Sequence, residues 1–344
     1  MQSQDSFRGG IARQVERLGR WTVRQLAARK GLRRLLNRYY ASLDADGRQR
    51  FQQRYARVFR SRGLLGNDGV ALSPGEWEIR FAGRTIRLPL RPAWAWLDWD
   101  HAVSVIGDDV EVIQTYEALV GSDRPPTLFL DVGANFGTHS LLFLAAGVPS
   151  ISFEPNPTCQ ALFHTLCEMN GVTGRWESVA VGNGSGQVEL VYPEKEPWLG
   201  SVSSDIQSQL KGFDAVKTHL VPLRRLDDYV DALTGHHLLI KIDVEGSEPQ
   251  VIEGATQLLR TCRPTLIFES YPFRDGVDVA GSRRTLFALL QERGYAIRAL
   301  PLQQDASPLE LGEFLESRGA NFMAVAMGAT PWPRAQGLHP ARAR

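Results

Sequence analysis

Acidic residues and glycines recur at the points in the sequence where apolar runs end. The first such point is Asp131, which follows Leu128–Leu130 and precedes Gly133, Asn135 and Gly137. A buried strand that ends in such a turn and leads into a helix brings backbone N–H groups close to a ligand. This order of residues predicts a site for a nucleotide-like cofactor.

The spacing of this turn differs from two common phosphate-binding signatures. A dinucleotide-binding turn has the pattern G-x-G-x-x-G, and a P-loop has Lys-Ser or Lys-Thr after its glycines. Here Asn135 stands in place of a second glycine, and neither dipeptide follows Gly137. The turn therefore has neither signature.

The second point is Glu154, which ends the segment Ile151–Glu154. One helix and one strand fill the interval after Gly137, so Glu154 is expected beside the glycine turn at the carboxyl edge of a parallel sheet. A carboxylate in that place accepts hydrogen bonds from both hydroxyls of a ribose. The alternative is a solvated carboxylate at a strand end, without a ligand.

The third point is Asp243, which follows the apolar run that contains Lys241 and is itself followed by Glu245 and Glu248. Three acids within so short a segment cost free energy unless they bind something or have shifted pKa values. Glu248 alone is interpreted as a cap of the next helix. Asp243 and Glu245 are candidate functional residues.

Short apolar segments alternate with helical patterns from Thr127 onward, which predicts an α/β fold whose parallel sheet carries helices on both faces. The predicted strands are 128–132, 150–154, 176–181, 238–243 and 265–269. The predicted helices are 138–146, 157–169, 248–260 and 282–293.

Two further features complete this part of the chain. Segments 187–192 and 219–223 alternate in polarity, which predicts an antiparallel insertion near the site. Segments 295–300 and 322–327 are expected to form a hairpin that completes the sheet.

The N-terminal part is strongly basic, although the whole chain has a net charge of only +1. Residues 1–64 contain fifteen Arg and one Lys against four acidic residues, which gives 16 − 4 = +12 and leaves 1 − 12 = −11 for the rest. This asymmetry predicts an anionic partner, such as a membrane surface or a phosphorylated acceptor, or docking onto a partner protein or the acidic remainder.

Apolar residues recur at helical spacing over 11–39, and a second helix is predicted from Asp46 as N-cap to Gly63. A hairpin is predicted over 76–90, and a helix over 109–119. The predicted division of the chain is a basic helical arm over 1–64, an N-terminal subdomain over 65–122, the main domain over 123–330 and a flexible tail over 331–344.

Composition is that of a globular protein with 43% hydrophobic and 22% charged residues. The apolar runs are too short to span a bilayer, and Met1–Gly10 lacks the apolar core of a secretory signal. The three cysteines form no metal-like cluster. We therefore expect a cytoplasmic protein without structural zinc, with peripheral contact at the inner membrane surface as one role for the arm.

Four motifs, taken together and in this order, resemble the FkbM-type methyltransferases. They are Leu130–Gly137, Phe153–Pro157, Leu226–Asp228 and Lys241–Glu248. The resemblance covers about residues 100 to 300, a domain-sized segment, and does not include the arm. Phe136 departs mildly from the aliphatic residue that is usual in the family.

The resemblance implies an S-adenosylmethionine-dependent enzyme that O-methylates sugars or natural products. The implied fold is the class I methyltransferase Rossmann-like fold, with a mostly parallel doubly wound sheet and an antiparallel C-terminal hairpin. The implied cofactor turn consists of Asp131, Gly133, Ala134, Asn135 and Gly137. The resemblance also implies that Glu154 binds the ribose and that the backbone near Ala180 lies by the adenine.

Transfer to a sugar hydroxyl requires a general base, because that hydroxyl is a poor acid. Asp243 is the first choice for this role and Glu245 the second, and His139 is an alternative that more often marks a cap region or a surface. A metal site has no clear ligand spacing. Trp94, Trp96 and Trp99 are interpreted as core residues under a hairpin rather than a stacking surface for the acceptor.

Three other functions compete with this hypothesis. A nucleic-acid methyltransferase would suit the basic arm, but the acidic site mouth repels a polyanion. A non-catalytic protein that binds a cofactor or partner can have the same fold. A dehydrogenase is disfavoured by the missing second glycine of the turn.

Overall fold

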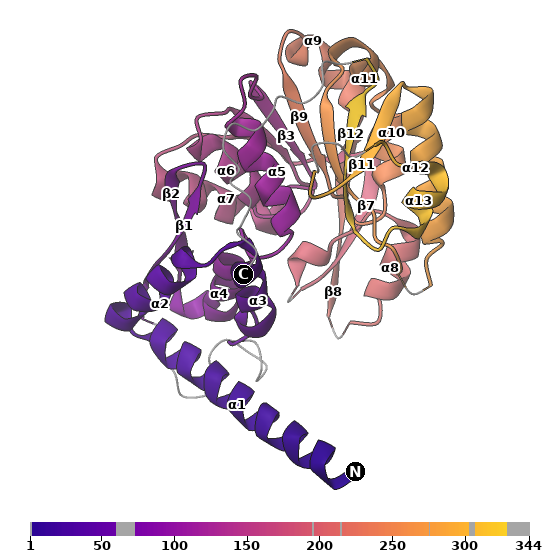
Figure 1. Cartoon of the computed structure of the whole chain (residues 1–344). Coiled ribbons are helices and arrows are strands. Elements are labelled where there is room, and N and C mark those ends of the chain that lie inside the picture. Colours follow the sequence, from indigo (N-terminus) through magenta and orange to yellow (C-terminus); the bar gives the residue numbers. More distant parts are fainter. Residues whose placement is uncertain are drawn as a thin grey trace. The chain divides into compact units, whose positions relative to one another are not determined.

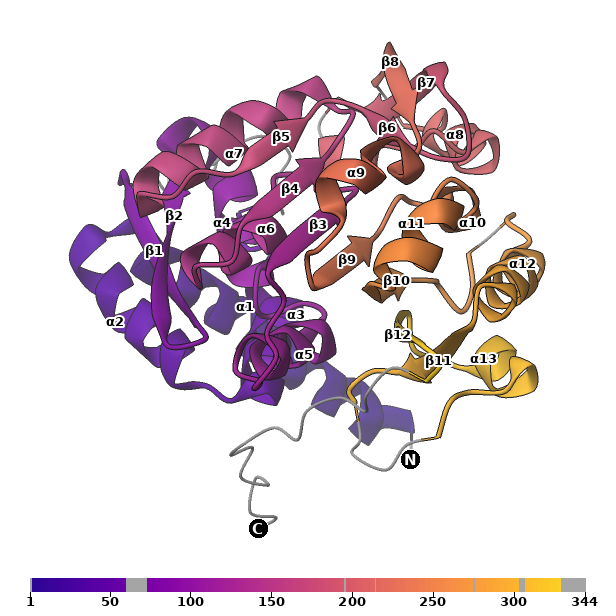
Figure 2. The same cartoon turned by 90° about the horizontal axis from the view of Figure 1, so that it is seen from above.

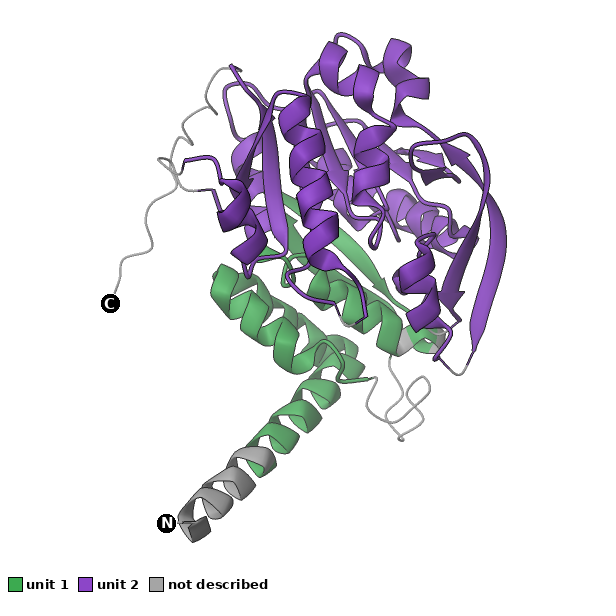
Figure 3. Cartoon of the chain, turned by 90° about the vertical axis from the view of Figure 1, so that its right-hand side faces the viewer, with its two compact units in different colours: residues 1–110 green, residues 111–344 purple. Residues whose placement is uncertain are grey.

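The computed structural model describes residues 2–59, 73–194, 196–213, 215–274, 276–302 and 307–328, without the side chains of residues 1–13, 93 and 95. Two compact units divide the chain, residues 1–110 and 111–344 (Figure 3). The predicted end of the second helix at Gly63 and the predicted tail 331–344 lie outside the described residues. The predicted boundaries at residues 64, 122 and 330 stay predictions.

The first unit combines helices with a two-stranded antiparallel sheet (Figure 1). Its elements are α1 (Gln2–Ala28), α2 (Lys30–Ser42), α3 (Ala45–Tyr55), β1 (Gly75–Phe81), β2 (Arg84–Leu90) and α4 (Ala95–Ser104). The predicted hairpin of β1 and β2 is confirmed, with Trp77 opposite Leu88. The Asp46 cap is wrong, because the side chain of Asp44 accepts the N–H of Gly47 at 2.7 Å and so caps α3.

Aromatic side chains form the core of this unit. Trp77 and Trp99 are fully buried and pack edge to face, with ring centroids 5.3 Å apart. The prediction that Trp94, Trp96 and Trp99 are core residues is thus correct for Trp99, whereas Trp94 is half exposed. Trp96 is intermediate in exposure.

The second unit is built on a seven-stranded sheet in the order β11-β12-β10-β9-β3-β4-β5. The strands are β3 (Leu128–Val132), β4 (Ser150–Phe153), β5 (Arg175–Glu177), β9 (Leu238–Ile242), β10 (Thr265–Glu269), β11 (Tyr295–Ala299) and β12 (Asn321–Ala326). β12 pairs antiparallel with both β10 and β11, and the other pairs are parallel. This is the α/β fold that the sequence predicted, a mostly parallel sheet with an antiparallel C-terminal pair.

Helices cover both faces of this sheet (Figure 2). They are α5 (Val110–Val120), α6 (Thr138–Ala145), α7 (Pro157–Asn170), α9 (Val230–Leu233), α10 (Glu248–Glu253), α11 (Thr256–Cys262), α12 (Val279–Glu292) and α13 (Leu311–Glu316). Leu130 of β3 joins the core beneath α9 to α12, whereas its neighbour Phe129 stacks on Phe143 of α6 with centroids 4.0 Å apart. Successive side chains of a strand point to opposite faces, so an all-apolar strand serves two cores.

A second sheet inserts between β5 and β9. It consists of β6 (Ala180–Val181), β7 (Gly186–Pro193) and β8 (Val216–Arg224) in the order β6-β8-β7, and α8 (Ser204–Leu210) lies between β7 and β8 in the chain. β7 and β8 pair antiparallel, which confirms the predicted insertion. The predicted single strand 176–181 is wrong, because β5 belongs to the central sheet and β6 to the insertion. The predicted helix 248–260 is likewise divided into α10 and α11 at Gly254.

Candidate functional site

The glycine turn follows β3 and packs directly on the segment that leaves β9. The backbone N–H groups of Gly133 and Ala134 both donate to the carbonyl oxygen of Phe153, at 2.9 and 3.1 Å. Gly133 has φ +81°, and a Cβ atom on it would lie only 1.7 Å from the carbonyl oxygen of Asp243. Only a glycine permits this approach of two backbones, which brings the first and third predicted points together.

We therefore expect Gly133→Ala to disrupt the site. The new methyl group meets backbone rather than a flexible side chain, and the left-handed φ adds strain, so the loss in the free energy of unfolding should reach about 3 kcal/mol. Urea denaturation measures this loss. Gly147→Ala is the matched control, because Gly147 also has positive φ but open space around its Cβ position. Equal losses in both variants would contradict the role of the close approach.

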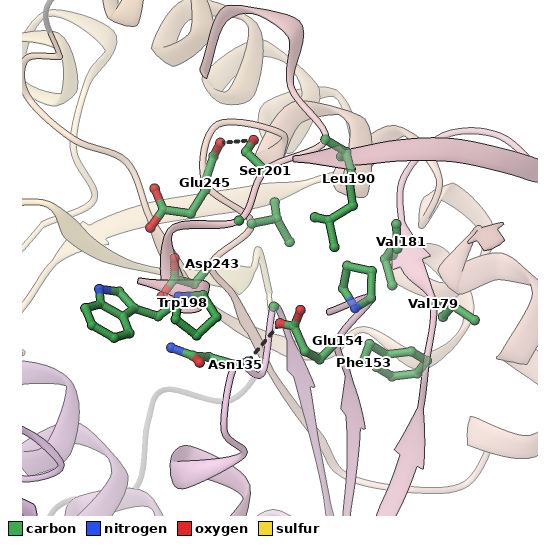
Figure 4. A pocket seen from close by; sticks show the side chains of 17 residues that line it. Asn135, Phe153, Glu154, Val179, Val181, Leu190, Trp198, Ser201, Asp243 and Glu245 are labelled. Carbon is green, nitrogen blue, oxygen red and sulfur yellow. Dashed lines mark hydrogen bonds between the residues drawn. The ribbon is translucent and has the colours of Figure 1, made fainter. Parts of the chain in front are cut away.

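Glu154 follows β4 and ties the turn to the next helix. Its Oε2 accepts the N–H of Asn135 at 2.9 Å (Figure 4). Its Oε1 accepts the N–H of Asn156 at 2.7 Å. The residue is only 9% exposed. Burial raises its pKa to about 7, although the two backbone donors act in the opposite direction. The carboxyl group is therefore rigidly held and keeps acceptor capacity for a ligand.

The raised pKa of Glu154 predicts a pH dependence of stability. Between its ordinary value of 4.5 and about 7 the folded protein holds this proton more tightly than the unfolded chain does. The contribution is therefore fully present below pH 4.5, and it is lost as the pH rises through about 7. Glu248, whose pKa burial also raises to about 7, adds a second contribution of the same sign.

Urea denaturation of Glu154→Gln between about pH 5 and 7.5 measures this effect. We expect a shallower fall of the free energy of unfolding than in the wild type, since one titrating group is gone. Glu168→Gln, at an exposed position of α7, is the control and should keep the wild-type slope. An unchanged slope in Glu154→Gln would contradict the assignment.

Asp131 precedes the glycine turn and is not among the pocket-lining residues. It is fully buried in β3, and its Oδ2 accepts both the N–H and the hydroxyl of Ser140 at 3.0 Å. Its Oδ1 has no hydrogen-bond partner among the described residues. Burial raises its pKa, and the charge of Lys241 counteracts that effect. Asp131 therefore fixes the start of α6, while one acceptor atom stays unpaired.

Asp243 directly follows β9 and forms a buried ion pair. Lys241 Nζ lies 2.7 Å from Asp243 Oδ2, and the Lys241 side chain is only 8% exposed. Burial alone would raise the pKa of Asp243, but the Lys241 ammonium, together with a hydrogen bond to Glu269, holds it below its ordinary value. Asp243 is therefore an ionised carboxylate at neutral pH, and a weak base.

Glu245 lies two residues further on and has different electrostatics. Its backbone is left-handed, with φ +52°, and its carbonyl oxygen accepts the hydroxyl of Ser201 at 2.9 Å (Figure 4). Its Oε2 lies 2.8 Å from Arg274 Nη1. Burial and the neighbouring Asp243 charge raise its pKa, and Arg274 limits that rise. Of these two acids, Glu245 is the stronger base.

These residues meet in one pocket at the carboxyl edge of the sheet (Figure 4). Six predicted site residues line it: Gly133, Asn135, Glu154, Ala180, Asp243 and Glu245. Apolar side chains of Phe153, Val179, Val181 and Leu190 form much of the remaining wall. Asp131, Ala134 and Gly137 are not among the lining residues. Ala134 is buried, and Gly137 is the N-cap of α6 and donates to the carbonyl oxygen of Ala134 at 2.7 Å.

A larger cavity adjoins this pocket on the side of α10 and α12. Val181 and Val202 line both spaces. The ion pair of Glu245 with Arg274 also links the two spaces, because Glu245 lines the pocket and Arg274 lines the cavity. Much of the cavity lining is polar and includes Ser203, Ser204, Gln250, Ser282 and Thr285. The two ligand spaces therefore share the walls formed by Val181 and Val202, and the Glu245–Arg274 ion pair joins a residue of one to a residue of the other.

The structure places His139 and Glu248, two further residues considered in the sequence, in different surroundings. His139 is not a surface residue, since it is partly buried and its Nδ1 lies 3.1 Å from the Tyr116 hydroxyl. Burial, with a smaller contribution from Lys241, lowers its pKa well below the ordinary value. Glu248 accepts the N–H groups of Val244 and Gly246 with Oε1, and so holds the turn that precedes α10.

Lys241, Arg274, Trp198 and Ser201 were missed as site residues in the sequence. The signal for Lys241 was present, since it is the one charged residue of the five that form β9. Arg274, Trp198 and Ser201 have no such signal in the sequence, because only the tertiary structure brings them to the site. Within the described ranges, no group of three or more His, Cys, Asp or Glu residues is arranged to hold a metal ion.

The model of the Methyltransferase FkbM domain family matches residues 131–297, which is just under half of the chain and includes every predicted site residue. This segment belongs to the FkbM methyltransferase family, whose cofactor is S-adenosylmethionine. The matched segment is therefore of a methyltransferase family, and it contains most of the mostly parallel α/β sheet of the second unit. No curated protein matched the chain.

Solved structures give distant likenesses. A methyltransferase FkbM from Methylobacillus flagellatus shares 16% identity with a TM-score of 0.35, over 66% of this chain and 54% of that chain. An O-methyltransferase from Bacillus cereus in complex with SAH shares 14% identity with a TM-score of 0.34, over 63% and 79%. This chain thus spans about half the length of the first of these structures, and likenesses at this level do not establish an activity.

Proposed function

We propose that the chain is an S-adenosylmethionine-dependent O-methyltransferase that acts on a hydroxyl of a sugar or natural-product acceptor. The observation that supports this most is the meeting of Glu154, Asp243 and Glu245 in one pocket beside the glycine turn. One carboxyl group is fixed by two backbone donors, one is held ionised by a lysine, and one is made more basic by burial. Three such environments suit three different tasks.

The pocket has a donor and acceptor set that fits S-adenosylmethionine. Glu154 would accept the ribose hydroxyls with its remaining lone pairs, and the apolar wall around Ala180 would contact the adenine. The ionised Asp243 suits the positively charged end of the molecule. When bound, S-adenosylmethionine supplies an electrophilic methyl group on a sulfonium.

We infer that Glu245 is the general base and that Asp243 binds, which reverses the order that the sequence favoured. A general base works best when its pKa lies near the working pH. The Lys241 ion pair moves Asp243 away from that range, whereas burial moves Glu245 towards it. Glu245 Oε atoms would take the proton of the acceptor hydroxyl, and Arg274 would hold the carboxylate in place at 2.8 Å.

The adjoining cavity is our proposed acceptor site. Its serine, threonine and glutamine side chains can donate to and accept from the hydroxyl groups of a sugar. Asp205, Glu269 and Asp278 also line it, against the single cation Arg274 among the described lining residues. This acidic lining repels a polyanion, which disfavours nucleic acid as the acceptor.

Two experiments test the proposal. Calorimetric titration with S-adenosylmethionine should give saturable binding at one site, and no binding would overturn the cofactor assignment. Mass spectrometry should compare glycans and small metabolites from cells with and without the protein. A hydroxyl-bearing compound should be lighter by one CH₂ unit in the cells that lack the protein. A methyl group found instead on nitrogen, carbon or nucleic acid would contradict O-methylation. Binding without any transfer would favour a non-catalytic protein.

A further inference from the structure

Helix α1 carries two apolar faces, of which one is left exposed. Val23 and Ala27 are 7% and 0% exposed and face the first unit's core. Val15, Leu18 and Trp21 are 65%, 64% and 59% exposed. Their spacing of three residues places them along one stripe of the helix, about 120° wide at 100° per residue. The stripe is therefore not part of the unit's own core.

Positive charge accompanies this stripe. Arg17 is exposed and lies about 40° from Trp21 around α1 at 100° per residue, at the edge of the stripe. Arg20 lies about 160° from Leu18, on the opposite face of the helix, where it pairs with Glu16. Arg34 and Arg38 are exposed on α2 next to a second exposed apolar pair, Leu35 and Tyr39. Residues 1–64 together carry a net charge of +12.

We propose that this stripe, Val15, Leu18 and Trp21 with Arg17 at its edge, is a docking surface for an anionic lipid bilayer. A bilayer surface satisfies both features, because the apolar side chains enter the interface while the guanidinium group remains at the phosphates. Trp21 has the amphipathic ring that favours this interface. None of the described helices is long and apolar enough to cross a membrane.

Two other binding partners of this surface, a second copy of the chain and a nucleic acid, are disfavoured. A second copy of the chain would bring another segment of +12 against the first, which costs free energy. A nucleic acid would neutralise the arginines but would leave the apolar stripe in water. The inference is independent of the proposed enzymatic function, since it rests on residues outside the matched family segment 131–297.

Flotation of the full chain with two kinds of vesicle tests the proposal. The vesicles are pure phosphatidylcholine, and phosphatidylcholine with about one third phosphatidylglycerol. We expect binding to the anionic vesicles that falls as salt is added, and little binding to the neutral ones. Equal binding to both, or none to either, would overturn the proposal. A dimer in analytical ultracentrifugation that the vesicles do not dissociate would also overturn it, in favour of a second copy.

Two variants and their controls locate the surface. Arg17→Glu should weaken binding about fivefold or more, because an arginine near an anionic surface contributes about fivefold and the substitution also adds a negative charge. Arg284→Glu changes the net charge equally at an exposed position elsewhere and should bind as the wild type. Leu18→Gln with Trp21→Gln should weaken binding about tenfold or more. Its control is Leu220→Gln, at a residue that is 65% exposed in β8.

Circular dichroism and thermal unfolding should give wild-type values for all of these variants, because every altered side chain is exposed. If the arm variants bind as tightly as their controls, the surface lies elsewhere and the proposal fails.

Discussion

Glu245→Gln should lower kcat by about 10²–10⁴ while the dissociation constant for S-adenosylmethionine stays near that of the wild type. The amide keeps the shape of the side chain and can still accept a hydrogen bond from Arg274, but it cannot take a proton. Single-turnover transfer of a labelled methyl group measures the rate, and calorimetry measures the affinity. Near-normal turnover in the variant would contradict the assignment of Glu245 as base.

Two neighbouring variants separate this effect from simple damage to the site. Asp243→Asn removes the carboxylate that lies 2.7 Å from the buried Lys241 ammonium, so it should reduce stability and cofactor affinity together. Arg274→Gln removes the cation that limits the raised pKa of Glu245. The acidic limb of the pH–rate profile should therefore move to higher pH in Arg274→Gln, and a purely structural role would lower the rate without moving that limb.

Glu154→Ala should weaken S-adenosylmethionine binding at least about 100-fold. In the proposed binding mode, the variant loses two hydrogen bonds from the ribose to a charged acceptor, each worth about 1.5–3 kcal/mol. It also leaves the N–H groups of Asn135 and Asn156 without their partner. Calorimetry measures the affinity, with Glu168→Ala on the exposed side of α7 as the control.

The same carboxyl group should make cofactor binding depend on pH. Because the pKa of Glu154 is about 7 without ligand, part of the protein must release a proton before Glu154 can present a carboxylate to the ribose as proposed. Affinity should therefore rise between about pH 6 and 8, with proton release in calorimetry. A Glu154→Gln variant should lose this slope. If its slope equals that of the wild type, another group is responsible.

The fold was largely predictable because its strands are buried on both faces. All five residues of β3 and all five of β9 are buried, so each reads as a continuous apolar run with one polar exception. The divided elements were not predictable in this way. The polarity pattern does not distinguish Trp176 from Val181, yet these residues belong to different sheets. Val181 belongs to the insertion because it pairs with Arg224 of β8, and this tertiary contact has no local signal in the sequence.

The site was predictable to the extent that its residues lie at the ends of strands. Glu154 and Asp243 follow β4 and β9, so the parallel order of the sheet brings them to one edge. Their pKa values were not predictable, because these depend on Lys241, Arg274 and burial. The contact of Ser201 with Glu245 joins residues 44 positions apart, and nothing local in the sequence signals it.

The insertion leaves the central domain at β6 and returns at β8, and these two strands pair with each other, Ala180 opposite Leu223. The segment where the chain enters the insertion therefore lies next to the segment where it leaves. The insertion also supplies Leu190, Trp198 and Ser201 to the pocket, whereas the glycine turn follows β3 of the central sheet. A substitution in the insertion therefore alters one wall of the pocket and leaves the pairing of β3 with β4 and β9 in place.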